Sequence, residues 1–106
     1  MRVAIADDSI IIREGLARVL ADKQVDVIGT AGDADELLRL IAAEKPDVAI
    51  VDIRMPPTHT DEGLIAAATI RQRFPDVSVL VLSQYTDAAY ALRVVAGNDR
   101  ACGYLL

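Results

Sequence analysis

Val48-Ala-Ile-Val-Asp52-Ile-Arg-Met-Pro-Pro57 is a short apolar run that ends on a carboxylate and then meets two prolines. Four consecutive apolar residues predict a strand that is buried on both faces, as in the centre of a parallel sheet. In open parallel sheets, ligands bind beyond the carboxyl ends of the strands. We therefore expect Asp52 to point into a binding site.

Outward from this segment, the chain alternates apolar runs with stretches of helical periodicity. The runs predict strands at residues 2–6, 25–30, 48–51, 77–82 and 103–106. Ser9 and Asp33 are expected to cap two helices, the second with Glu36 at capping-box spacing, and two more helices are expected at residues 61–74 and 86–96. The inward face of the first helix is predicted to consist of four residues: Ile12, Leu16, Val19 and Leu20.

The resulting βαβαβαβαβ order predicts a doubly wound α/β fold, because its connections are long enough for right-handed crossovers. The 106 residues form a single domain. The hydrophobic fraction of 53% is ample for a core, and with only 4% aromatic residues that core must be mostly aliphatic.

Composition also limits the classes of function. The net charge of -5, with no basic cluster, argues against direct nucleic-acid binding. The single cysteine, Cys102, excludes an internal disulfide framework and fits the reducing cytoplasm. We identify no signal peptide and no apolar run of membrane-spanning length.

Acidic residues close two of the predicted strands. In the flavodoxin-like strand order 2-1-3-4-5, the first and third strands are neighbours, so Asp7 and Asp8 should converge with Asp52. Unpaired like charges would raise at least one pKa, and a bound cation would relieve the repulsion. Hard oxygen ligands suit Mg²⁺. Ser83 ends the fourth strand, where its hydroxyl could donate a hydrogen bond to an oxyanion held at Asp52.

A purely structural explanation exists for each acid. An aspartate before a helix often serves as a cap or complements the helix dipole, and a lone aspartate at a strand end is often structural. The joint pattern at several strand ends favours a site. No glycine-rich phosphate loop is present, which argues against a nucleotide-binding domain.

With these residues in view, the chain resembles a CheY-like response-regulator receiver domain, most closely the NarL/LuxR-type transcriptional regulators. The resemblance covers nearly the whole chain and rests on these segments: Ile5-Ala-Asp7-Asp8-Ser9, Arg13-Glu-Gly-Leu16, Pro46-Asp-Val-Ala-Ile-Val-Asp52-Ile-Arg-Met-Pro56, Glu62-Gly63, Val81-Leu-Ser83 and Gly103-Tyr-Leu-Leu106.

The resemblance implies that Asp52 is a phosphoacceptor. It would attack a phosphohistidine of a sensor histidine kinase, or a small phosphodonor, and so become an aspartyl phosphate. Asp8, Asp52 and the backbone carbonyl of Arg54 would ligate Mg²⁺ directly, and Asp7 would hold the metal partly through water. Such a module assists its own phosphorylation and dephosphorylation and is not an enzyme acting on a separate substrate.

The resemblance also implies how the signal leaves the site. Ser83 would be a hydroxyl switch that moves toward the new phosphoryl oxygen, and Tyr104 an aromatic switch that changes rotamer with it. The local charge would then bias a two-state surface. In this subfamily we expect phosphorylation to promote homodimerisation and so to control a C-terminal helix-turn-helix DNA-binding domain.

Two departures from the family pattern stand out. Family members carry a lysine directly after the Gly-Tyr-Leu-Leu motif, and this chain stops at Leu106, one residue short of it. The last helix and the DNA-binding domain are likewise absent, so we expect a truncated chain. Gln84 stands where many receivers have a small residue, and we hypothesise that it slows phosphate turnover.

Two other functions remain open at this point. A Mg²⁺-dependent phosphatase of the haloacid-dehalogenase class also uses an aspartyl phosphate, but it needs a second aspartate two residues after the nucleophile, where this chain has Arg54. Alternatively, the domain is a phosphorylation-independent interaction module in which the acidic pocket is vestigial.

Overall fold

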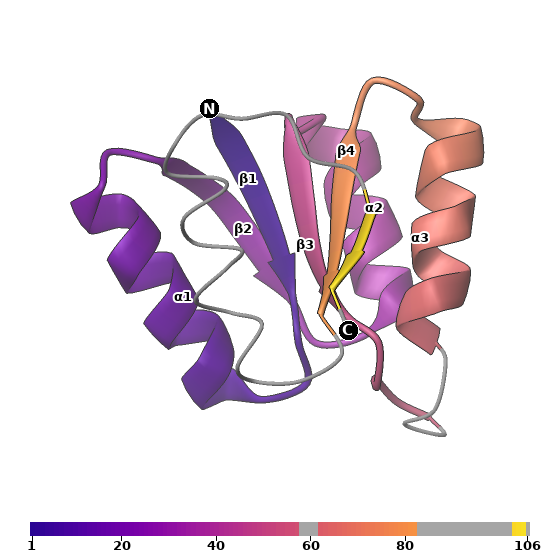
Figure 1. Ribbon diagram of the computed structural model, residues 1–106, viewed down its shortest axis with the longest axis horizontal. Helices are drawn as coiled ribbons and strands as arrows, with labels where there is room; N and C mark the ends of the chain where they lie inside the picture. The colour runs from indigo at the N-terminus through magenta and orange to yellow at the C-terminus, as the bar shows by residue number, and fades with distance from the viewer. Residues whose placement is uncertain (58–61, 83–102, 106) are drawn as a thin grey trace.

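The chain folds into a five-stranded parallel sheet with helices on both faces (Figure 1). The structure is a computed structural model that describes residues 1–57, 62–82 and 103–105. Its elements are β1 Arg2–Ala6, α1 Ile10–Asp22, β2 Asp26–Ala31, α2 Ala34–Glu44, β3 Val48–Asp52, α3 Glu62–Arg73, β4 Ser78–Leu82 and β5 Gly103–Leu105. The sheet order is β2-β1-β3-β4-β5, which confirms the predicted α/β class and the 2-1-3-4-5 arrangement.

The observed boundaries differ from the predicted ones by a residue at several places. Val25 does not join β2, because its N–H donates to the carbonyl of Leu20 (2.9 Å) and closes the end of α1. Val77 does not join β4, because its N–H donates to the carbonyl of Phe74 (3.0 Å). The helix predicted at residues 86–96 lies outside the described residues.

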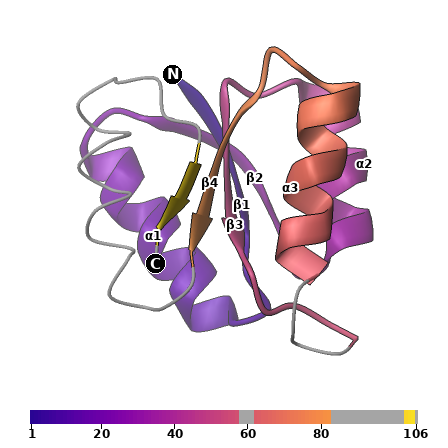
Figure 2. The ribbon, with the colours of Figure 1, turned by 45° about the vertical axis from the view of Figure 1, so that its right-hand side comes forward.

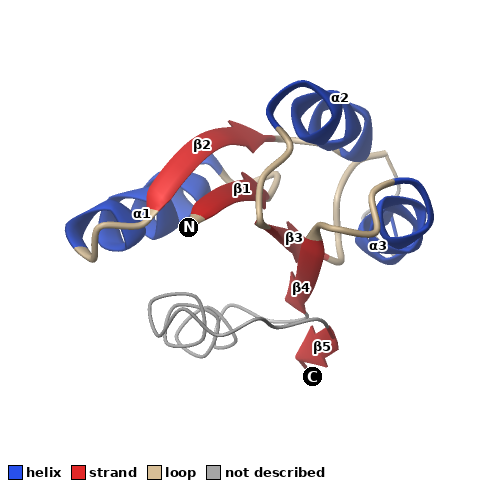
Figure 3. Cartoon of the chain, turned by 90° about the horizontal axis from the view of Figure 1, so that it is seen from above, coloured by secondary structure: helices blue, strands red, loops and turns tan. Residues whose placement is uncertain are grey.

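The helices lie in two layers around the sheet. The view along the sheet shows α1 on one face and α2 with α3 on the other (Figure 3), and the rotated ribbon agrees (Figure 2). Side chains of a strand alternate between the two faces. Val48 and Ile50 accordingly belong to the core beneath α1, whereas Ala49 and Val51 belong to the core beneath α2 and α3.

Burial of the central strand agrees with the prediction. The four residues Val48 to Val51 are between 0% and 2% exposed. A strand with both faces covered excludes water from its hydrogen bonds and buries apolar side chains alternately in two cores. The continuous apolar run of the sequence is thereby explained.

The inward face of α1 is narrower than predicted. Leu16 and Leu20 are buried and Ile12 packs partly against the core, but Val19 is 38% exposed. At 3.6 residues per turn, Val19 lies about 80° around the helix from the midpoint of Leu16 and Leu20. It therefore sits at the rim of the apolar stripe, and its assignment to the inward face was wrong.

Helix α2 begins at a variant of the predicted capping box. Asp33 is the cap, since its Oδ1 accepts the backbone N–H of Glu36 at 2.8 Å. The Glu36 carboxylate reaches back to the N–H of Gly32 (2.8 Å), one residue before the position of a standard capping box. The helix ends at Glu44, where Lys45 takes a left-handed φ of 48°. Among the described helices, none has both the length and the apolar character needed to cross a membrane.

Candidate functional site

Three carboxylates meet at the carboxyl edge of the sheet, at the ends of β1 and β3. Ala6 pairs with Val51 in the parallel ladder, so the residues that follow this pair on the two strands lie side by side. Asp7 and Asp8 directly follow β1, and Asp52 is the last residue of β3. One carboxylate oxygen from each of the three lies within 4.8 Å of the others. The predicted convergence is therefore confirmed.

The three acids differ in their access to solvent. Asp7 is only 3% exposed, Asp8 is exposed, and Asp52 is half-buried. The Oδ1 of Asp7 accepts the N–H of Ser9 (2.8 Å), and the backbone N–H of Asp7 donates to the carbonyl of Ala31 (3.0 Å). Asp7 is thus held by β2 on one side and by the start of α1 on the other.

Ser9 caps α1, as predicted. Its Oγ accepts the N–H of Ile12 at 3.3 Å. Because Ser9 fills the capping position, neither Asp7 nor Asp8 is needed for that role. The helix cap alone does not explain why two acids stand at this edge.

Burial and like charge act together on Asp7. The loss of hydration and, after it, the negative charges of Asp52 and Asp8 raise the pKa of Asp7 to about 6, although the hydrogen bond from the Ser9 N–H acts to lower it. The expectation that at least one carboxyl in the cluster has a raised pKa is confirmed. A cation bound among the three oxygens would favour the ionised form.

The loop after β3 is fixed by hydrogen bonds to its neighbours. The N–H of Arg54 donates to Oδ1 of Asp52 (3.2 Å). The N–H of Ile53 donates to the carbonyl of Leu82 in β4 (3.0 Å), and Met55 is fully buried. Arg54 thus belongs to the site by its backbone, while the role of its carbonyl oxygen as a metal ligand stays a prediction.

The remaining predicted site residues lie largely outside what the structure describes. Ser83 and Gln84 follow β4 and are among the residues not described. Leu82, which precedes Ser83, is the ladder partner of Asp52. Tyr104 lies in β5 opposite Val81, and only its backbone is described. The roles of these side chains stay predictions.

Gly63 contacts the site although sequence reasoning assigned it no role. Its N–H donates to the carbonyl of Ile53 (2.8 Å), directly after Asp52. The sequence signal was weak: a glycine in the first turn of a helix, where helix propensity alone disfavours it.

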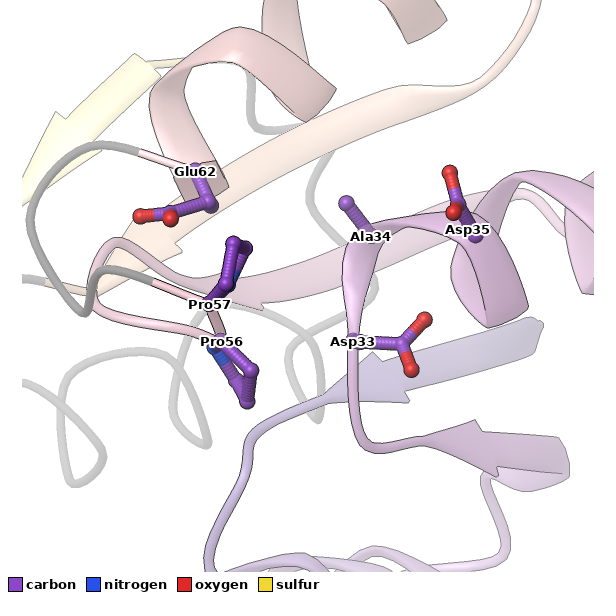
Figure 4. Close-up of a pocket in the computed structure, with 6 residues that line it drawn as sticks. All are labelled: Asp33, Ala34, Asp35, Pro56, Pro57 and Glu62. Carbon is purple, nitrogen blue, oxygen red and sulfur yellow. The ribbon is translucent and has the colours of Figure 1, made fainter.

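A groove of about 370 Å³ opens beside the site, between the start of α2 and the loop after β3 (Figure 4). Pro56 and Pro57 form one side of it, with Ala34 opposite. The carboxylates of Asp33 and Glu62 point away from each other, so these acids do not form a second convergent cluster.

The chain is similar to known proteins along its whole length. The family model described as the response regulator receiver domain matches residues 3–106. The chain is 36% identical to the oxygen regulatory protein NreC of Staphylococcus haemolyticus, over 100% of this chain and 48% of that protein. It therefore spans about half the length of this curated relative.

Two solved structures show the same fold. The receiver domain of the putative response regulator NarL from Mycobacterium tuberculosis is 35% identical, with a TM-score of 0.73, over 99% of this chain and 82% of that one. RcsB from Salmonella enterica serovar Typhimurium, solved on a promoter with the phosphomimetic BeF₃⁻, is 31% identical, with a TM-score of 0.68, over 77% of this chain and 41% of that one.

Proposed function

The chain belongs to the response regulator receiver domain family, and on this basis we propose that Asp52 accepts a phosphoryl group from a phosphohistidine of a sensor histidine kinase. The convergence of Asp7, Asp8 and Asp52 within 4.8 Å is the observation that carries the proposal. Phosphoryl transfer depends on positioning and on charge stabilisation. The three carboxylates could position the reacting groups, and a cation held between them would supply the charge stabilisation.

In the transfer, a carboxylate oxygen of Asp52 forms a bond to phosphorus as the phosphorus–nitrogen bond of the phosphohistidine breaks. The histidine nitrogen keeps the electron pair of that bond. Asp52 suits this role because it is half-buried, and because the N–H of Arg54 holds its Oδ1 at 3.2 Å. Small donors such as acetyl phosphate would react by the same displacement.

The oxygen donors fit a hard divalent cation. Asp8, Asp52 and the carbonyl of Arg54 would hold Mg²⁺, with Asp7 partly through water. When bound, Mg²⁺ neutralises charge on the transferring group. The raised pKa of Asp7, to which the charges of Asp52 and Asp8 contribute, supports the fit, since a cation relieves that repulsion.

Signal output requires a surface that reads the phosphorylated state. Ser83 would move toward the phosphoryl oxygen and Tyr104 would change rotamer, shifting the domain between two states. Phosphorylation would favour a homodimer and so control a DNA-binding domain elsewhere in a cytoplasmic transcription regulator. The RcsB relative solved on a promoter with BeF₃⁻ supports this proposal.

The test is adduct formation on Asp52. This chain and a version extended through the lysine position are each incubated with Mg²⁺ and either acetyl phosphate or beryllofluoride. Intact mass detects the phosphoryl adduct, and ¹⁹F NMR detects the beryllofluoride adduct. We expect stoichiometric labelling of the wild type and none of Asp52→Asn. The matched control, Asp35→Asn on the exposed first turn of α2, should label normally.

Two results would contradict the proposal. Continuous release of phosphate without a stoichiometric adduct would instead indicate a phosphatase. The absence of any adduct in both versions would indicate a phosphorylation-independent interaction module.

A further inference from the structure

We propose that Gly63 is a positioning residue for Asp52, because the first turn of α3 packs on the backbone of the phosphoacceptor segment with no room for a side chain. The inference deepens the proposed function and rests on Asp52 being the acceptor. It concerns how the acid is held in place by a part of the chain that follows it by eleven residues.

The peptide units around Ile53 join three elements. The N–H of Ile53 donates to the carbonyl of Leu82 in β4 at 3.0 Å, and its carbonyl accepts the N–H of Gly63 in α3 at 2.8 Å. Ile53 directly follows Asp52. The phosphoacceptor is therefore anchored through the backbone between β4 on one side and α3 on the other.

The space at Gly63 is closed by backbone atoms. A Cβ built on Gly63 would lie 2.5 Å from the Cα of Ile53, and it would overlap the carbonyl oxygen of Asp52. Contacts below 3.0 Å require something to shift. Neither atom belongs to a flexible side chain, so either α3 must lift away or the Asp52–Ile53 peptide must move.

Three other glycines, at residues 15, 29 and 32, do not have this property. A Cβ at Gly15 would meet nothing within 4 Å. One at Gly29 would meet the side-chain tip of Leu40, and one at Gly32 the guanidinium of Arg13, both of which can yield by rotation. Among these four positions, only at Gly63 would an added Cβ collide with backbone atoms.

A displaced Asp52–Ile53 peptide would change the placement of the Asp52 carboxylate relative to Asp7 and Asp8. One carboxylate oxygen of each acid lies within 4.8 Å of the others, and a shift of the Asp52 backbone would change these spacings. Outer residues that orient metal ligands commonly affect metal affinity by about 10- to 100-fold. Gly63 acts in this way through the backbone, without a side chain of its own.

The test compares the same substitution at two helical glycines. Gly63→Ala should weaken Mg²⁺ affinity by about 10- to 100-fold, measured by titrating the backbone amide resonances of residues 7, 8 and 52. It should reduce beryllofluoride adduct formation in parallel. Gly15→Ala is the matched control, because the added methyl meets nothing, and it should leave both measurements unchanged.

A double variant separates positioning from stability. Alanine in place of Gly15 raises helix propensity, so Gly15→Ala combined with Gly63→Ala should recover part of any lost melting temperature. Mg²⁺ affinity should remain weak in this double variant. Recovery of the affinity together with the stability, or wild-type affinity in Gly63→Ala itself, would overturn the proposal.

Hydrogen exchange on the wild type keeps the inference testable if the variant does not fold. The amides of Ile53 and Gly63 should be protected to the same degree as those in β3, and exchange at the rate of an exposed loop would refute the anchor. If the wild-type protein binds Mg²⁺ but forms no adduct, that result counts against the proposed function alone. The positioning role of Gly63 is then tested by Mg²⁺ affinity and amide hydrogen exchange.

Discussion

Asp7 is the residue whose ionised form is disfavoured both by burial and by neighbouring negative charges. It is 3% exposed, and the loss of hydration together with the charges of Asp52 and Asp8 raises its pKa to about 6. The carboxyl is ordinary in the unfolded chain, with a pKa near 3.9. Between about pH 4 and 6 the folded chain therefore holds more protons than the unfolded chain, and stability falls as the pH rises through this window.

Removing this charge should stabilise the chain when no divalent cation is present. Asp7→Asn is expected to raise the free energy of unfolding by about 1–3 kcal/mol near pH 7, because asparagine keeps the oxygen that accepts the N–H of Ser9 but carries no charge. At about pH 4 the gain should vanish. Urea unfolding at both pH values measures it, and an equal gain at both would show that charge is not the cause.

At the level of elements, the start of α2 is stabilised by side-chain hydrogen bonds in and just before its first turn. Asp33 accepts the N–H of Glu36 and Glu36 accepts the N–H of Gly32, both at 2.8 Å. These bonds satisfy N–H groups that have no partner within the helix. They also set the position of the turn between β2 and α2, next to the site.

Two substitutions of Asp33 should separate the loss of the cap hydrogen bond from the loss of the negative charge. Asp33→Ala is expected to lower the free energy of unfolding by about 1 kcal/mol, as measured by urea unfolding. Asp33→Asn should lie close to the wild type, because its amide oxygen can accept the same N–H. If the asparagine variant loses as much as the alanine variant, the negative charge at the helix N-terminus is the more important factor.

At the scale of the whole molecule, the strand order creates the site. Asp7 and Asp52 are far apart in the sequence, and they meet because β1 and β3 are paired neighbours in the sheet. The unfolded chain does not hold its carboxylates in this arrangement. A cation that binds all three therefore binds the folded state preferentially and stabilises it.

Mg²⁺ should accordingly raise the free energy of unfolding by about 2.7 kcal/mol at a concentration 100 times its Kd. Urea unfolding at constant ionic strength measures the effect. Asp52→Asn should lose most of it, whereas Asp35→Asn, an exposed change on α2, should keep it. Equal stabilisation of both variants would mean that the ion acts through general screening and not at the three carboxylates.

Local pattern was enough to predict much of this protein. A run of four apolar residues ending at Asp52 indicated a buried central strand, and Ser9 and Asp33 were recognised as caps, because burial on both faces and capping leave a mark within a few residues. Acids at the ends of two strands indicated the site once the strand order was assumed. The order itself is the usual one for this alternation of strands and helices.

Other features were decided only by tertiary structure. The exposure of Val19 depends on how α1 is rotated on the sheet, and the role of Gly63 depends on the close approach of α3 to the peptide after Asp52. The raised pKa of Asp7 likewise needs the burial and the two neighbouring charges. These features depend on contacts, burial and charges that involve residues distant from one another along the chain. The sequence therefore determines them only through the complete tertiary fold.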